Sequence, residues 1–145
     1  MQPIHVVSDM EMADRAWGKL CSHAYALRTQ ISNHARLALG SDAPVESPNP
    51  FLGLQAAVTR RRQDGYPRPE GWHPEQRITL QEALEGFTIG PAFAAGMEDR
   101  IGQMKAGYLA DLLILAKDPF SCEPEEIGTL RPEAVMVGGK WVWQA

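Results

Sequence analysis

Short apolar runs alternate with longer amphipathic stretches along the first part of the chain. Residues 3–7 and 36–40 each hold an apolar run of strand length, the first with a histidine inside it. Between these runs, apolar side chains recur at intervals of three and four residues, which predicts a helix from Met10 to Ile31. Asp9 is expected to cap the start of this helix and Asn33 to close its end. The apolar face of this helix would consist of Met12, Ala16, Leu20, Ala24, Leu27 and Ile31.

The next segment repeats the order of strand and helix. Asn49 and Pro50 are favoured residues at an N-cap and a first helical position, so a second helix is expected from Phe51 to Arg61. Both predicted strands are apolar enough to be buried on two faces, as in a parallel sheet. We therefore expect residues 3–7 and 36–40 to lie parallel and adjacent, joined by a right-handed crossover.

The second half of the chain changes character. Residues 63–77 contain three prolines and two glycines without periodicity, which predicts a long loop. Such a loop covers an active site or packs against another part of the molecule. Thr79 and Glu82 have the spacing of a capping box, so a third helix is expected to begin there.

The tail is expected to form a small β unit. Strands are predicted over residues 108–116, 133–137 and 140–143, with Gly138 and Gly139 as the turn between the last two. We expect this hairpin to pair with the first of these strands.

Composition and charge exclude several classes of function. Of 145 residues, 44% are hydrophobic and 22% are charged, which is typical of a soluble globular protein. The net charge of −4 offers no basic surface for nucleic acid, and Arg60, Arg61 and Arg62 are expected to be a solvated helix end. No apolar run approaches the roughly eighteen residues of a membrane span, and residues 1–9 are not expected to be a secretory signal. Cys21 and Cys122 have no second cysteine nearby, which argues against a CxxC site or a disulfide framework, and a cytoplasmic protein is predicted.

Two residues beside the predicted strands could take part in chemistry. His5 lies at the end of the first predicted strand, where it is either a residue of the active site or a structural residue. Asp42 follows the second strand after Gly40 and Ser41, at the edge where parallel α/β proteins bind ligands. A carboxylate there binds a cation and accepts a proton from water, or it only caps a turn. The four histidines lack the spacing of a complete zinc site.

The motifs around these residues occur in an order that resembles the metal-dependent amidohydrolases, in the family 3 branch that includes N-substituted formamide deformylase. The sequences GSDAPV at residues 40–45 and PFLG at residues 50–53 resemble the last barrel strand and helix of that family. Residues 1–9 are similar to its seventh strand. Residues 105–112 and 137–140 are similar to the segment that leaves the barrel and completes a small β-sandwich.

The resemblance implies an α/β fold in two parts. Residues 1–100 would form the last βα units of a TIM-type (β/α)8 barrel, with strands seven and eight, their helices and extra helices. Residues 101–145 would form the C-terminal part of a composite β-sandwich. A whole barrel takes about 250 residues, so the barrel would be incomplete and the chain would be a C-terminal portion of a longer enzyme.

The activity implied by the resemblance is hydrolysis of carbon–nitrogen bonds other than peptide bonds, in amides or N-acyl and N-formyl amines, by metal-activated water. Asp42 matches the family's aspartate on the eighth strand and would be both metal ligand and catalytic base. His5 would contact the substrate. The family's remaining metal ligands have no match here, so a divalent metal such as zinc is expected in the complete enzyme and none bound by this chain alone.

The implied partners are a small amide-type substrate and the missing N-terminal part of the barrel. Without that part, an uncovered strand edge is expected to drive self-association. The alternative is a truncated, non-catalytic structural or interaction module derived from such an enzyme. Upstream sequence with the missing ligands would favour the enzyme.

Overall fold

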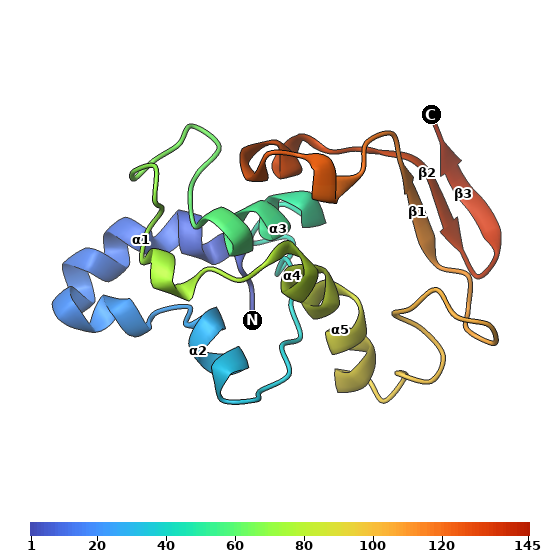
Figure 1. Cartoon of the computed structure of the whole chain (residues 1–145), viewed down its shortest axis with the longest axis horizontal. Coiled ribbons are helices and arrows are strands. Elements are labelled where there is room, and N and C mark those ends of the chain that lie inside the picture. The colour runs from blue at the N-terminus through green and yellow to red at the C-terminus, as the bar shows by residue number, and fades with distance from the viewer.

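The α-helices all lie before residue 95, and the strands begin at Leu112, in the computed structural model, which describes residues 1–145 (Figure 1). The α-helices are α1 (Ile4–Trp17), α2 (Leu27–Ser32), α3 (Pro50–Thr59), α4 (Leu80–Phe87) and α5 (Ile89–Ala94). Short 3₁₀ helices are η1 (Gly18–His23), η2 (Pro74–Gln76), η3 (Pro119–Ser121) and η4 (Pro124–Thr129). The strands are β1 (Leu112–Leu115), β2 (Pro132–Val137) and β3 (Lys140–Gln144). None of the helices has both the length and the apolarity needed to cross a bilayer.

The first predicted strand is wrong, because helix α1 already begins at Ile4. Val6, Met10 and Ala13 are buried at helical spacing, and their packing outweighs the strand preference of the β-branched residues near the start. Asp9 therefore lies within the helix and does not cap it.

The single long helix predicted from Met10 to Ile31 is wrong as well. Helix α1 ends at Trp17, where Gly18 adopts a φ of 51°, and the chain continues as η1 and α2. The predicted apolar face is not the buried one, since Met12 is 57% and Leu20 is 70% exposed. Asn33 does cap the end of α2, with a negative φ.

Residues 36–40 are extended but do not pair with residues 3–7, so the predicted pair of strands is also wrong. A parallel backbone pairing instead joins Met1 to Leu39. The amino group of Met1 donates to the carbonyl of Ala38 at 2.7 Å, and the amide of Gly40 donates to the carbonyl of Met1 at 3.1 Å. These two bonds flank Leu39 in the pattern of adjacent parallel strands.

The extended segment is fixed from its other side by helices α4 and α5. The amide of Leu39 donates to the carbonyl of Gly86, and a Cβ atom on Gly90 would lie 1.8 Å from the carbonyl oxygen of Leu37. Only glycine permits this close approach. The capping box of Thr79 and Glu82 that begins α4 is confirmed.

The main hydrophobic core lies between this segment and helix α3. The predicted start of α3 is confirmed, since the side chain of Asn49 accepts a hydrogen bond from the amide of Phe51 at 3.1 Å. The buried members of this core are Leu27, Leu37, Leu39, Phe51, Leu54, Ala57, Ile78, Ala83, Ile127 and Leu130.

The basic cluster is not a solvated helix end, which corrects the sequence interpretation. Arg60 is fully buried at the left-handed C-cap of α3, and its guanidinium donates to the backbone carbonyls of Trp72, Tyr25 and Ala24 at 2.6, 2.9 and 3.3 Å. Burial lowers the pKa of Arg60 to about 10. The loop over residues 63–77 thus packs against the molecule through Trp72, which is itself buried.

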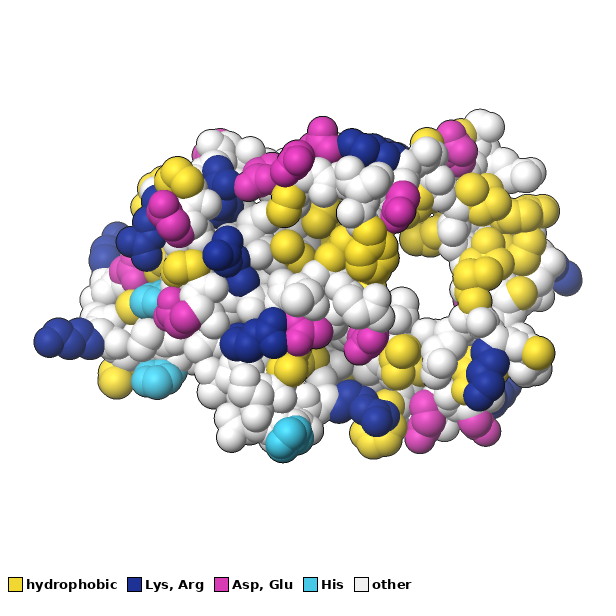
Figure 2. Space-filling view, viewed as in Figure 1, with side chains coloured by type: hydrophobic (Ala, Val, Ile, Leu, Met, Phe, Trp, Pro, Cys, Tyr) yellow, Lys and Arg dark blue, Asp and Glu magenta, His cyan; other side chains and the backbone are white.

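The predicted hairpin is confirmed. Strands β1, β2 and β3 form one antiparallel sheet in that order, with the turn at Gly138 and Gly139, which have φ angles of 56° and 79°. The sheet stands beside the helices in Figure 1, and Figure 2 shows apolar side chains gathered over it. Ile127 and Leu130, between β1 and β2, pack instead into the helical core.

Candidate active site

His5 and Asp42 contact each other although 37 residues separate them in the sequence. The imidazole Nε2 of His5 lies 3.3 Å from Oδ2 of Asp42. His5 stands in the first turn of α1, and Asp42 stands in the loop after the extended segment. Both segments have just left the parallel pairing of Met1 with Leu39, and parallel segments end at the same edge, which is why the two side chains meet.

The loop that holds Asp42 is a defined turn. Asp42 adopts a φ of 62°, its carbonyl accepts a hydrogen bond from the amide of Val45, and Ser41 Oγ accepts one from the amide of Ala43. The turn is therefore closed by backbone groups and by Ser41. The carboxylate of Asp42 faces His5 and does not cap the turn.

A second contact ties the same loop to α1. Ser8 Oγ donates a hydrogen bond to Glu46 Oε1 at 2.5 Å. Ser8 lies one turn beyond His5 on the helix, so this bond and the bond between His5 and Asp42 join the loop to one end of α1.

Asp9 and Tyr25 support the imidazole from behind. Asp9 Oδ2 lies 3.9 Å from Nδ1 of His5, one helical turn away, and it also accepts a hydrogen bond from the hydroxyl of Tyr25. The ring of Tyr25 stacks on that of His5, with 6.5 Å between the centroids and 6° between the planes. Burial, and then the hydrogen bond to Asp9 and its charge, raise the pKa of Tyr25 to about 12, so Tyr25 remains a neutral donor at physiological pH.

Sequence reasoning missed Asp9 and Tyr25 as neighbours of this site. The four-residue separation of His5 and Asp9 places them on one helical face, but this signal appears only when residues 4–17 are interpreted as a helix. Tyr25 adopts a φ of 50° after η1, a conformation that the spacing of residues does not predict.

The Asp42 carboxylate is open to solvent. Its side chain is 48% exposed, Oδ2 faces His5, and Oδ1 makes no hydrogen bond with the protein. Carboxylate oxygen and imidazole nitrogen are both ligands of divalent metals such as zinc. The arrangement offers one free carboxylate oxygen beside an imidazole at the edge of a parallel backbone pairing. This is the kind of place where hydrolytic enzymes of the α/β class bind substrate.

Comparison with known proteins assigns the class. The sequence model of the amidohydrolase family matches residues 1–143, and the chain belongs to that family. The family resemblance of the sequence motifs is thereby confirmed, and the solved structures similar to this chain include a metal-dependent hydrolase.

Several relatives can be named individually. YtcJ of Bacillus subtilis is 32% identical over 145 residues, which is 99% of this chain and 27% of that protein. N-substituted formamide deformylase of Arthrobacter pascens is 32% identical over 115 residues, covering 79% of this chain and 20% of the deformylase. The solved structure of a metal-dependent hydrolase from Pyrococcus horikoshii superposes with a TM-score of 0.70 and 26% identity, over 86% of this chain and 25% of that one. The chain therefore spans about a quarter of the length of these relatives.

Proposed function

We propose that this chain is the part of a metal-dependent amidohydrolase that supplies Asp42 as metal ligand and proton carrier. The reaction would be hydrolysis of a carbon–nitrogen bond other than a peptide bond, in an amide or an N-formyl or N-acyl amine. The contact between His5 and Asp42 at one edge of the parallel pairing is the observation that supports it most strongly. The name of the Arthrobacter relative supports an N-substituted formamide as a first substrate to test.

The residues present fit a divalent metal in part. Oδ1 of Asp42 is free and solvent-facing, whereas Nε2 of His5 is already directed at Oδ2. Asp42 would hold the metal, and other ligands would come from the remainder of a complete enzyme, since catalytic zinc sites use three or more protein ligands. When bound, the metal would polarise the substrate carbonyl and lower the pKa of water.

Asp42 would then move the proton. With Oδ1 on the metal, Oδ2, which faces His5, would accept a proton from the attacking water as the water oxygen bonds to the carbonyl carbon. The same oxygen returns that proton to the nitrogen as the carbon–nitrogen bond breaks, giving an amine and a carboxylic acid. His5, positioned by Asp9 and Tyr25, orients the Asp42 carboxylate and contacts the substrate.

The fold proposed for the complete enzyme is a TIM-type barrel, to which residues 1–100 contribute the last units, with residues 101–145 in a neighbouring β-sandwich. The parallel pairing of Met1 with Leu39 supports the barrel. The rest of such an enzyme would cover the apolar side chains that the sheet exposes. In the absence of that part, the sheet would pair with a second copy of this chain.

A chimera separates the enzyme from the alternative of a non-catalytic module. The aligned segment of the Arthrobacter deformylase is replaced by this chain, and hydrolysis of N-substituted formamides is measured. Activity that depends on Asp42 supports the proposal. A folded, metal-loaded chimera without activity, or activity that persists without the Asp42 carboxylate, contradicts it.

A further inference from the structure

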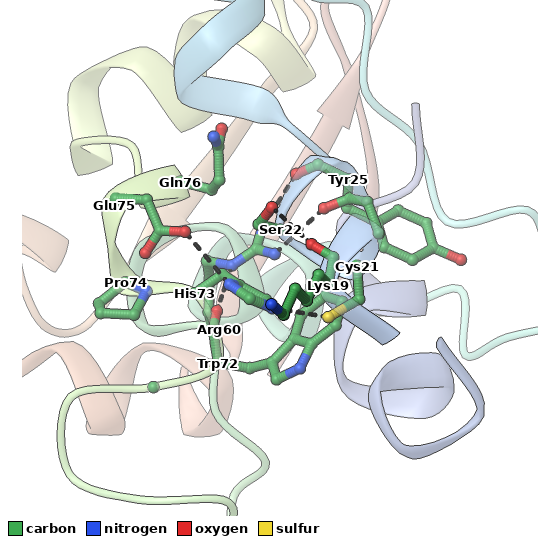
Figure 3. Close-up of polar contacts among 12 residues, drawn as sticks. Lys19, Cys21, Ser22, Tyr25, Arg60, Trp72, His73, Pro74, Glu75 and Gln76 are labelled. Atoms are coloured by element: carbon green, nitrogen blue, oxygen red, sulfur yellow. Dashed lines mark hydrogen bonds and ion pairs between the residues drawn. The ribbon is translucent and has the colours of Figure 1, made fainter. Parts of the chain in front are cut away.

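A second group of metal-ligating side chains lies away from Asp42. Donor atoms of Asp14, Cys21 and His73 all lie within 4.8 Å of one another. Cys21 Sγ lies 3.2 Å from Nε2 of His73 (Figure 3). The three residues come from α1, from η1 and from the loop before η2. Asp14 stands nine residues beyond His5 on the same helix, which is about 13 Å at 1.5 Å per residue, so the two groups are separate.

Two of these three side chains are held by hydrogen bonds from behind. Nδ1 of His73 lies 3.2 Å from Glu75 Oε1, which leaves Nε2 directed at the cysteine (Figure 3). The indole nitrogen of Trp72 donates to Oδ1 of Asp14 at 3.0 Å, which leaves the other carboxylate oxygen available. Metal-binding histidines and carboxylates are typically oriented by such partners.

We propose that Asp14, Cys21 and His73 bind one zinc ion, with Glu75 orienting the imidazole of His73. Sulfur, nitrogen and oxygen donors together suit zinc, whereas magnesium and calcium prefer oxygen alone. Cys21 is buried and Asp14 is exposed, so the ion would enter from the Asp14 side and keep its fourth position open to water. The site would fasten the loop over residues 63–77 to helix α1.

A nucleophilic cysteine explains the same contacts less well. Cys21, His73 and Glu75 have the order of a cysteine–histidine–carboxylate triad, but Cys21 is buried, with only 7% of the residue exposed, and offers no access to a substrate. A divalent cation would balance the charges of the carboxylate and the thiolate, and its binding would release the thiol proton.

This proposal departs from the expectation that the chain alone binds no metal, and it does not depend on the proposed activity. The test is titration of the 145-residue chain with cobalt(II) as a spectroscopic probe, followed by zinc as competitor. Binding of one cobalt ion with a sulfur-to-cobalt charge-transfer band, which zinc removes, is the expected result. Absence of that band overturns the proposal.

Matched variants assign the band to its residues. Cys21→Ser should abolish it, whereas Cys122→Ser, at the other free thiol, should leave it unchanged. Glu75→Gln keeps all three ligands, so it decides the question even where Cys21→Ser does not fold, and it should weaken zinc binding about tenfold or more. Loss of the band in Cys122→Ser, or unchanged affinity in Glu75→Gln, overturns the proposal. Asp42→Asn should bind cobalt as the unchanged chain does, which separates this site from the proposed active site.

Discussion

His5 Nε2 lies 3.3 Å from Asp42 Oδ2 because two distant segments leave one parallel backbone pairing at the same edge. The contact joins the first turn of a helix to a turn that is closed without help from the Asp42 side chain. It therefore leaves one carboxylate oxygen free for a ligand, while the other orients the imidazole.

Replacing His5 tests its proposed contact with the substrate. In the deformylase chimera, His5→Ala should raise KM roughly fivefold, because one lost hydrogen bond is worth about 1 kcal/mol. Steady-state kinetics at saturating metal checks this, with His34→Ala, at an exposed histidine, as the control. An unchanged KM would mean that His5 does not touch the substrate.

The sequence predicts where this candidate site lies better than it predicts which secondary-structure elements form it. The motif around Asp42 places a carboxylate after an extended apolar segment, and the structure has it there. The environment of His5 was mispredicted, because residues 4–7 are β-branched around a histidine and favour a strand locally. Burial of Val6, Met10 and Ala13 beneath Trp72 decides the conformation instead, and that contact is 59 residues or more away in sequence.

Arg60 illustrates the same difficulty. Three consecutive arginines at a helix end are typical of a solvent-exposed surface. Nothing in the local sequence indicates that the first of them is buried in the core. Its burial depends on carbonyls of Ala24 and Tyr25, which only the tertiary fold brings to it. By contrast, the capping box at Thr79 and the glycine turn of the hairpin are local signals, and both were predicted correctly.

Arg60→Ala should destabilise the protein by about 3 kcal/mol, because the buried carbonyls of Trp72 and Ala24 lose their donor and each unpaired group costs about 1–3 kcal/mol. Urea unfolding at neutral pH measures the free energy. Arg61→Ala is the control, since it removes an ion pair with the half-exposed Glu125 that is worth about 1 kcal/mol or less. Equal losses in the two variants would contradict the account of Arg60.

Glu82 should make stability fall in acid. Hydrogen bonds from Arg28 lower the pKa of Glu82 to about 2, against 4.5 for the ordinary side chain. Because the folded state binds the proton less tightly, the stabilisation is complete above pH 4.5 and is lost as pH falls from there toward 2. Glu82→Gln keeps the capping pattern and removes the charge.

Urea unfolding midpoints measured from neutral pH down toward pH 2 check this expectation. The difference in unfolding midpoint between the unchanged chain and Glu82→Gln should shrink as the pH falls through this range. Glu85→Gln, on the same helix, should show no such convergence. A constant difference for Glu82→Gln would show that the ion pair with Arg28 does not contribute.

The exposed sheet should make the isolated chain associate. Trp141 and Trp143 on β3 are 45% and 47% exposed, and an apolar strand edge recruits another chain. Sedimentation velocity should show concentration-dependent dimers or larger species, reduced in the Trp141→Lys, Trp143→Lys double variant. Met104→Lys, at an exposed apolar residue outside the sheet, should change nothing. A monomer at all concentrations contradicts this expectation.

The central claim, that Asp42 holds the metal and moves the proton, is tested most directly by the kcat/KM of the deformylase chimera with Asp42→Asn. The variant should lose about a hundredfold or more, the contribution of a positioned base, while the chimera remains folded. Glu46→Gln, in the same loop, should stay within about twofold because it can still accept the hydrogen bond from Ser8. Activity retained by Asp42→Asn, or lost equally in Glu46→Gln, would contradict the claim.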